Sequence, residues 1–150
     1  MKLSTAQIGK SGELLVQYKL LNYGIESSQM TTDSGIDLVA FSSKNQKAIT
    51  IQVKTNQKPK PGGGSGKMTL DWWLPDNSPA EFIALVDLST EKIWFFSYDE
   101  FSKNAQQHSK TKYHIYMYVD HKAISRKHKR YLDVHFEEFL LENTIDKIFK

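Results

Sequence analysis

The sequence contains no cysteine, and it has no apolar run long enough to cross a membrane. Without cysteine sulfur the chain cannot form disulfides, zinc ribbons or a thiol nucleophile. Its first residues also lack the apolar core that a signal peptide requires. We therefore expect a soluble, intracellular protein of the cytoplasm with no membrane partner.

Length and composition predict an ordinary globular domain. The 150 residues are 39% hydrophobic and 25% charged, which suits one domain over residues 1–150 with a single core. The formal net charge of +3 is too small to demand an anionic partner.

The positive charge is concentrated in two segments of the chain. The first contains Lys54, Lys58, Lys60 and Lys67, and the second contains Lys122, Arg126, Lys127, Lys129 and Arg130. Segregated charge of this kind is compatible with binding to phosphates. For a charge run taken alone, a solvated surface is the slightly better interpretation.

The beginning of the chain predicts a helix of about twenty residues. Ser4 or Thr5 can cap its start, and Gly24 stands where a helix often ends. We expect its apolar surface to comprise Leu14, Leu15, Tyr18 and Leu21. Another stripe carries Glu13 with Gly9, Val16 and Leu20, and Gly9 and Gly12 would let a second backbone come close.

The rest of the chain predicts strands followed by a closing helix. Apolar and alternating patterns indicate strands over residues 24–30, 36–41, 48–55, 68–74, 81–88, 92–98 and 112–119. Residues 98–107 and 135–149 predict helices, and residues 56–68 predict a flexible basic loop without regular structure. This order indicates an α/β layer, with an early antiparallel meander against the first helix as its core.

Two familiar site patterns are absent. The stretch "PGGGSGKM" is not a phosphate-binding P-loop, because Pro61 replaces the first glycine and Met68 replaces the Ser or Thr that would hold magnesium. The five histidines are spaced six or seven residues apart, which does not match a zinc site. We expect surface or hydrogen-bonded histidines.

Polar residues occupy strand positions in two neighbouring stretches. In "AITIQVKT" the alternation places Gln52 and Lys54 on the face opposite the apolar residues. A half-exposed strand would look the same, and for a lone strand that interpretation is better. If residues 42–46 close a hairpin, however, Asp37 approaches Gln52 and Lys54, and Glu13 on the first helix can join them.

Such a group has the chemistry of a magnesium site. Two close carboxylates repel one another unless a cation is present. Mg²⁺ accepts carboxylate and carbonyl oxygens while it keeps waters and a substrate phosphate oxygen. Gln52 can ligate through its amide oxygen, and Lys54 can stabilise charge that builds on phosphorus.

The stretches "GKSGELL", "SGIDLVAF" and "ITIQVKT" resemble the PD-(D/E)XK nucleases, which have the restriction-endonuclease-like fold. The resemblance implies an α/β (α+β) fold whose mixed β-sheet is flanked by helices. It implies a catalytic site of Glu13, Asp37, Gln52 and Lys54, with the metal held by Glu13, Asp37, Gln52 and the Val53 carbonyl. It also implies Mg²⁺, replaceable by Mn²⁺, and products that carry a 5′-phosphate. The sequence departs from the commonest pattern in having Gln at position 52 and no proline before Asp37.

Two further features near these stretches have alternative interpretations. Asp33 could assist a metal, but "Asp-Ser-Gly" is ordinary turn chemistry, which we favour. Trp72 and Trp73 point to opposite faces of a strand, so at most one can touch DNA.

The resemblance predicts a site-specific endonuclease of duplex DNA, of homing or restriction type. DNA contacts are expected from Lys58, Lys60, Lys67, Lys122, Arg126, Lys127, Lys129 and Arg130. Cutting both strands would require a symmetric homodimer or homotetramer. The alternatives are a Holliday-junction resolvase, a catalytically inactive DNA-binding module of the same fold, and, least favoured, an interaction domain with no affinity for nucleic acid.

Overall fold

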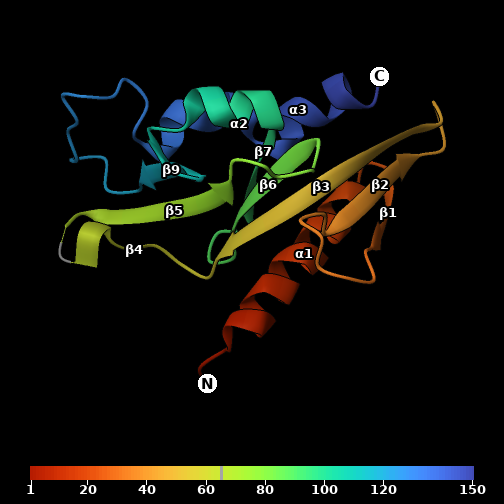
Figure 1. The fold of residues 1–150 in the computed structure, drawn as a ribbon, viewed down its shortest axis with the longest axis horizontal. Helices are drawn as coiled ribbons and strands as arrows, with labels where there is room; N and C mark the ends of the chain where they lie inside the picture. The colour runs from red at the N-terminus through yellow and green to blue at the C-terminus, as the bar shows by residue number, and fades with distance from the viewer. Residues whose placement is uncertain (65) are drawn as a thin grey trace.

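The computed structural model describes residues 1–64 and 66–150, and a five-stranded mixed sheet runs through its centre (Figure 1). Its strands, in spatial order, are β1 (Glu26–Gln29), β2 (Leu38–Ser42), β3 (Lys47–Asn56), β6 (Phe82–Asp87) and β7 (Lys92–Ser97). The first three form an antiparallel meander, β6 runs parallel to β3, and β7 is antiparallel to β6. The predicted hairpin between β2 and β3 is confirmed.

A second, four-stranded antiparallel sheet lies against one face of the first. Its strands, in spatial order, are β4 (Lys60–Pro61), β5 (Met68–Pro75), β9 (Lys112–Tyr118) and β8 (Gln107–Ser109). Leu70, Trp72 and Leu74 of β5 point into a shared core with Ile83 and Phe96 of the central sheet. The opposite face of the second sheet is left open to solvent along β5 and β9.

Helices complete both layers. Helices α1 (Thr5–Leu21) and α3 (Leu141–Ile148) bury apolar residues against one face of the central sheet. Helix α2 (Tyr98–Asn104) and the 3₁₀ segment η2 (Asp133–Phe139) join the second sheet on the other face. The predicted mixed sheet flanked by helices is therefore confirmed. No helix in the described residues is both long enough and apolar enough to cross a membrane.

The first helix has the predicted length, and the predicted stripe faces the sheet. Ser4 caps it, and its buried residues are Gly12, Val16 and Leu20. Leu14, Tyr18 and Leu21, which we expected to provide much of its apolar surface, have exposed fractions of 53%, 60% and 60%. The stripe that carries Glu13, Val16 and Leu20 packs on the sheet, where Gly12 allows close approach.

Helix α1 and strand β3 come closest at Gly12. A β-carbon built on Gly12 would lie 1.8 Å from Oγ1 and 2.8 Å from Cβ of Thr55. At Gly9 the same construction meets no atom within 4 Å. The prediction of a close approach is thus confirmed for Gly12 and wrong for Gly9.

The loop after β3 is more regular than expected. Lys60 and Pro61 pair with Thr69 and Met68 as β4, and residues Gly62–Gly64 form a single 3₁₀ turn. The prediction that residues 56–68 lack regular structure is therefore wrong in part. The part of that loop at position 65 lies outside the described residues.

Two predicted helices are also shorter than the sequence suggested. Helix α2 ends at Asn104, and Gln107 begins strand β8, which was not predicted. The expected closing helix over 135–149 is split, because Leu140 is extended and forms a β-bridge with Trp94. This bridge ties the chain to the edge strand β7 and lets α3 turn onto the face that α1 covers.

The seam at Gly12 gives a stability prediction. Replacing Gly12 with Ala should lower the free energy of unfolding by about 1–3 kcal/mol, because Thr55 cannot move its Cβ away without shifting β3. Replacing Gly9 with Ala in the same helix should raise it by about 0.5–1 kcal/mol, since the added methyl meets nothing. Urea unfolding of both variants would measure this, and equal effects would contradict the seam.

Candidate active site

Asp37 lies where the meander opens, one residue before β2. Its backbone N–H donates to the Ile51 carbonyl at 2.8 Å, and its own carbonyl accepts from the Met30 N–H at 3.1 Å. The Oδ2 of its carboxylate accepts a hydrogen bond from the backbone N–H of Val53 at 2.7 Å. Three hydrogen bonds therefore hold Asp37, two from β3 and one from the residue after β1, and its carboxylate is fixed at the strand that carries Gln52 and Lys54.

Glu13 reaches this place from helix α1. Its side chain is 18% exposed, and its Oε2 lies 2.7 Å from Nζ of Lys10. That oxygen is buried and, although Lys10 is close, it has no partner with hydrogen-bond geometry among the described residues. Lys10 itself donates to Oε1 of Gln29 at 2.7 Å. One oxygen of Glu13 is thus desolvated with only an ion-pair contact to balance it.

The two carboxylates influence one another. Burial raises the pKa of Asp37 above its ordinary value, and the nearby Glu13 carboxylate raises it further. The Val53 N–H and the Lys54 ammonium lower it, but they do not compensate fully. Glu13, Asp37 and Lys54 are thus close enough for their charges to affect one another, as predicted, and the ionised form of Asp37 is disfavoured there.

A small cavity of about 240 Å³ opens beside the pair. Its wall includes Lys10, Glu13, Gln29, Asp33 and Asp37. Lys10 and Gln29 were not among the predicted site residues. Lys10 could have been found, because it stands three residues before Glu13 on one helix face. Asp33, which we assigned to a turn, is exposed and lies in the irregular connection between β1 and β2.

Gln52 has a different orientation from the one that the resemblance implies. It is 8% exposed, and its Oε1 accepts a hydrogen bond from Oγ of Ser78 at 2.5 Å. Ser78 lies in the connection between β5 and β6, and nothing in the sequence links it to Gln52. Neither Gln52 nor Lys54 lines the 240 Å³ cavity, although Lys54 is close enough to lower the pKa of Asp37.

The donor set suits a hard cation that is only partly held by protein. Carboxylate and amide oxygens are the ligands that Mg²⁺ takes, and Mg²⁺ usually keeps several waters. Among residues 1–64 and 66–150, no group of three or more His, Asp or Glu side chains is placed to hold a metal ion. A metal at Glu13 and Asp37 would therefore need Gln52, the Val53 carbonyl or water to complete its ligands.

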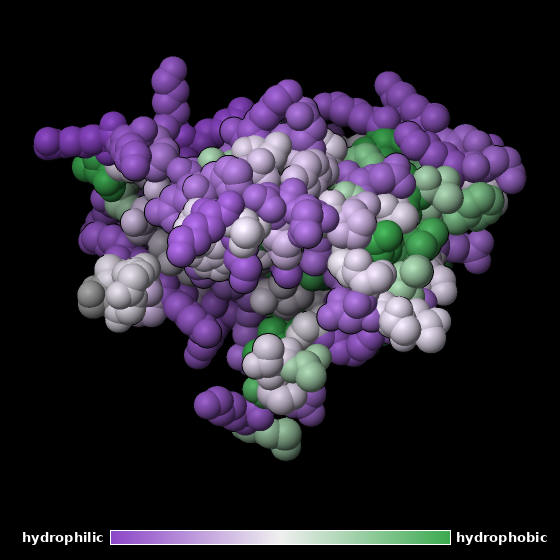
Figure 2. Space-filling model, viewed as in Figure 1, coloured by the Kyte–Doolittle hydropathy of each residue, from purple (hydrophilic) through white to green (hydrophobic). Residues whose placement is uncertain are grey.

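The predicted DNA contacts are distributed along one end of the molecule, which is mostly hydrophilic on the face shown in Figure 2. Lys58, Lys60, Lys122, Arg126, Lys127 and Lys129 are exposed. Lys67 lies 3.6 Å from the Asp120 carboxylate, which joins the two basic segments. Arg130 is half-exposed but is engaged by the protein itself, because its guanidinium contacts Glu138 and Asn104 and lies over the Phe139 ring.

The tryptophans and histidines are arranged largely as expected. Trp72 is 2% exposed in the core, and Trp73 is 40% exposed. Trp73 stacks on His114, with ring centroids 3.9 Å apart. All five histidines have a polar or aromatic partner; His114, for example, hydrogen-bonds Asp71 and Gln107.

Comparison with known proteins gives structural likeness only. No protein-family model matches the chain, and no curated protein matches it by sequence. Its structure is similar to that of a bacterial homing endonuclease, I-Ssp6803I, with a TM-score of 0.60 and 14% identity over 99% of this chain and 100% of that one. It is also similar to Hjc, a Holliday junction resolvase from Archaeoglobus fulgidus, an archaeal hyperthermophile. There the TM-score is 0.50, with 16% identity over 71% of this chain and 82% of that one.

The raised pKa of Asp37 predicts a pH effect on stability. In the folded state the group holds its proton more tightly than in the unfolded state, so its contribution to stability is present at low pH and is lost as pH rises through the folded pKa. Asp37→Asn keeps the shape without the charge. In metal-free buffer the melting temperature of the variant minus that of the original protein should therefore increase between about pH 3 and pH 6. A difference that is constant or falls with pH would contradict a raised pKa of Asp37 in the folded state.

Proposed function

We propose that this protein, which has the fold of the nuclease structures it resembles, is a Mg²⁺-dependent endonuclease that hydrolyses phosphodiester bonds at specific sites in duplex DNA. The observation that supports this most directly is the pair Glu13 and Asp37. Both belong to a cavity wall, Glu13 has a buried oxygen without a hydrogen bond, and burial together with the Glu13 charge raises the pKa of Asp37. A divalent cation is what such a pair lacks.

Each residue then has a separate role. Glu13, Asp37 and the Val53 carbonyl would hold the metal, with Gln52 completing the set through its amide oxygen. Mg²⁺, or Mn²⁺ in its place, would neutralise the carboxylates and polarise the scissile phosphate. Lys54 is placed to bind a phosphate oxygen and to stabilise charge that develops on phosphorus.

The hydrogen bond from Ser78 has a consequence for Gln52. Oε1 of Gln52 already accepts a hydrogen bond from the Ser78 hydroxyl, although an amide oxygen has a second lone pair that can bind a metal. If the side chain stayed committed to Ser78, the site would be weaker than one with a third carboxylate. This is the specific observation that keeps the inactive DNA-binding module as an alternative.

The share of the chain that each similar structure covers favours a homing or restriction-type enzyme over a junction resolvase. The match to the homing endonuclease spans 99% of the chain, whereas the match to the resolvase spans 71%. A site-specific enzyme with one active site per chain would cut both strands as a symmetric homodimer or homotetramer. Its products would carry 5′-phosphates.

Cleavage provides the direct test. Lys54→Ala and Asp37→Asn should each reduce Mg²⁺-dependent cleavage of a randomised duplex library by at least about 100-fold, because both remove charge at the reacting phosphate. Lys44→Ala, in the β2–β3 turn at the far end of the meander, is the matched control and should cleave normally. Full cleavage by the Lys54 variant would rule out the assigned site.

Two outcomes of the same assay would identify the alternatives. Preferential cutting of four-way junctions, whatever their sequence, would identify a resolvase. Salt-sensitive duplex binding without any cleavage in Mg²⁺ or Mn²⁺ would identify the inactive module.

The two arginines of the basic segment should behave differently. Arg126→Gln should weaken duplex binding and lower the slope of log affinity against log salt by about 1, because Arg126 is exposed and free to meet a phosphate. Arg130→Gln should chiefly lower the melting temperature, since its guanidinium is used by Glu138 and Phe139. Binding titrations at several salt concentrations, with thermal unfolding, separate these effects; identical salt slopes for both variants would contradict the assignment.

A further inference from the structure

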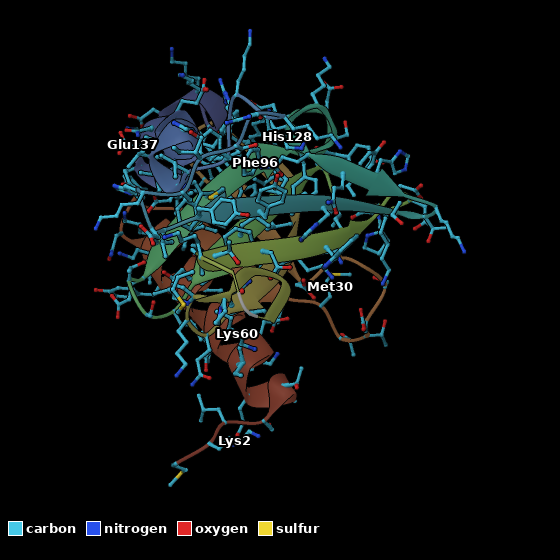
Figure 3. The ribbon with its side chains drawn as sticks, turned by 90° about the vertical axis from the view of Figure 1, so that its left-hand side faces the viewer. Lys2, Met30, Lys60, Phe96, His128 and Glu137 are labelled. Carbon is cyan, nitrogen blue, oxygen red and sulfur yellow. The ribbon has the colours of Figure 1, made fainter. Side chains whose placement is uncertain are left out.

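The open face of the second sheet carries a cavity that the proposed cleavage site does not use. It has a volume of about 610 Å³, and Tyr116, Tyr118 and His114 of β9 lie on one side of it. Asp71 of β5 and Lys60 of β4 lie opposite. In Figure 3 Lys60 lies below this face and His128 above it, with β5 and β9 crossing between them.

The alternation of the two long strands creates this face. Leu70, Trp72, Ile115 and Met117 point into the core, so their neighbours in sequence must point out. Asp71 is paired with Tyr116, and Trp73 with His114. The outward residues are therefore aromatic and polar side chains in adjoining positions rather than the charged, solvated residues usual on an exposed sheet face.

A hydrogen-bonded group holds the Asp71 carboxylate in place. His114 is 9% exposed and lies 2.9 Å from Oδ2 of Asp71 through Nε2 and 3.1 Å from Oε1 of Gln107 through Nδ1. Trp73 covers the imidazole by stacking. The hydrogen bond with His114 lowers the pKa of Asp71 despite partial burial, and the charge of Lys60 contributes in the same direction. The result is a fixed, ionised acceptor beside two tyrosine rings.

The chemistry of this cavity fits one unpaired nucleotide. Its volume is that of a small-ligand site. Tyrosine rings stack on any base, and Lys60 with the bare backbone of Gly62–Gly64 can take a phosphate. A carboxylate repels phosphates, so Asp71 would be out of place on a surface that only followed the DNA backbone. It is better explained as an acceptor for the N–H groups of a base edge. Guanine offers two adjacent N–H donors on its pairing edge, and thymine offers one.

The strand that carries Asp71 also contacts the proposed active strand. Asn56 at the end of β3 donates from Nδ2 to the Asp71 carbonyl at 2.7 Å. Asn56 follows Lys54 by two residues on the same face, a separation of about 7 Å along β3. We infer that the open face of the second sheet, around Tyr116 and Asp71, binds an unpaired nucleotide of the DNA close to the cleaved phosphate and favours guanine there.

This inference rests on the proposed function for its DNA substrate, but it can be tested without cleavage. Binding is measured in EDTA by fluorescence anisotropy on three labelled duplexes: perfectly paired, with one unpaired guanosine, and with one unpaired thymidine. The original protein should bind the guanosine bulge about 5- to 100-fold more tightly than the perfect duplex. It should bind the thymidine bulge with intermediate affinity.

Two variants connect that preference to the cavity. Tyr116→Leu keeps apolar bulk but not the flat ring, so it should abolish the preference for bulges and leave perfect-duplex affinity unchanged. Tyr23→Leu, the same change at an exposed tyrosine beyond α1, should have no effect. Asp71→Asn should reduce the ratio between guanosine and thymidine bulges, whereas Asp146→Asn on α3, an equal change in charge, should not.

Several results would overturn the inference. The original protein could bind bulged and perfect duplexes with equal affinity, or bind none of the three DNAs. Tyr116→Leu could weaken binding to both kinds of duplex equally, or Asp71→Asn could leave the ratio of affinities for guanosine and thymidine bulges unchanged. If Tyr116→Leu fails to fold by circular dichroism, the Asp71 ratio decides alone. Absence of cleavage in Mg²⁺ would count against the proposed function only, because these affinities are measured without metal.

Discussion

The close packing of α1 on β3 at Gly12 is the constraint on which the candidate active site depends. Because Thr55 occupies the space of a Gly12 β-carbon, the helix lies almost against the strand. The next residue, Glu13, is thereby brought to the carboxylate of Asp37. A side chain at position 12 would lift the helix and separate the two acids. Glycine destabilises a helix because it loses much conformational freedom on folding. At position 12 this cost is offset, because the close contact with β3 positions Glu13.

The meander supplies the other half of the geometry. Asp37 is bonded through its backbone to Ile51 and through its side chain to Val53, so its position follows the register of β2 on β3. A slip of one residue would exchange the apolar and polar faces of β3, placing Lys54 in the core. The buried Ile49 and Ile51 prevent that slip. Packing of the core and placement of the site are consequently specified by the same alternation.

Local patterns allowed much of the fold and the proximity of Glu13 to Asp37 to be predicted, and the misses have physical causes. The hairpin, the capped first helix and the approach of Glu13 to Asp37 all follow from spacing within short stretches. Leu14, Tyr18 and Leu21 are exposed although they are large and apolar, because Gly12, Val16 and Leu20 form the side of α1 that approaches the sheet. The hydrogen bond from Ser78 to Gln52 and the capture of Arg130 by Glu138 join distant segments, and no local pattern encodes such contacts.

Each of the two sheets carries carboxylates, and their surroundings differ. At Glu13 and Asp37 two carboxylates lie close together in a partly buried place that disfavours the ionised form of Asp37, which suits a cation. At Asp71 it uses His114 and Lys60 to stabilise a carboxylate that stays ionised, which suits a neutral donor rather than a metal. Asn56 joins the strand of the first site to the strand of the second. A strand of DNA that presents a phosphate to Lys54 would therefore pass near the strand of Asp71, whose ionised and partly exposed carboxylate can accept hydrogen bonds from a base edge. Phosphodiester cleavage and base recognition would then both depend on the same short segment, Lys54 to Asn56.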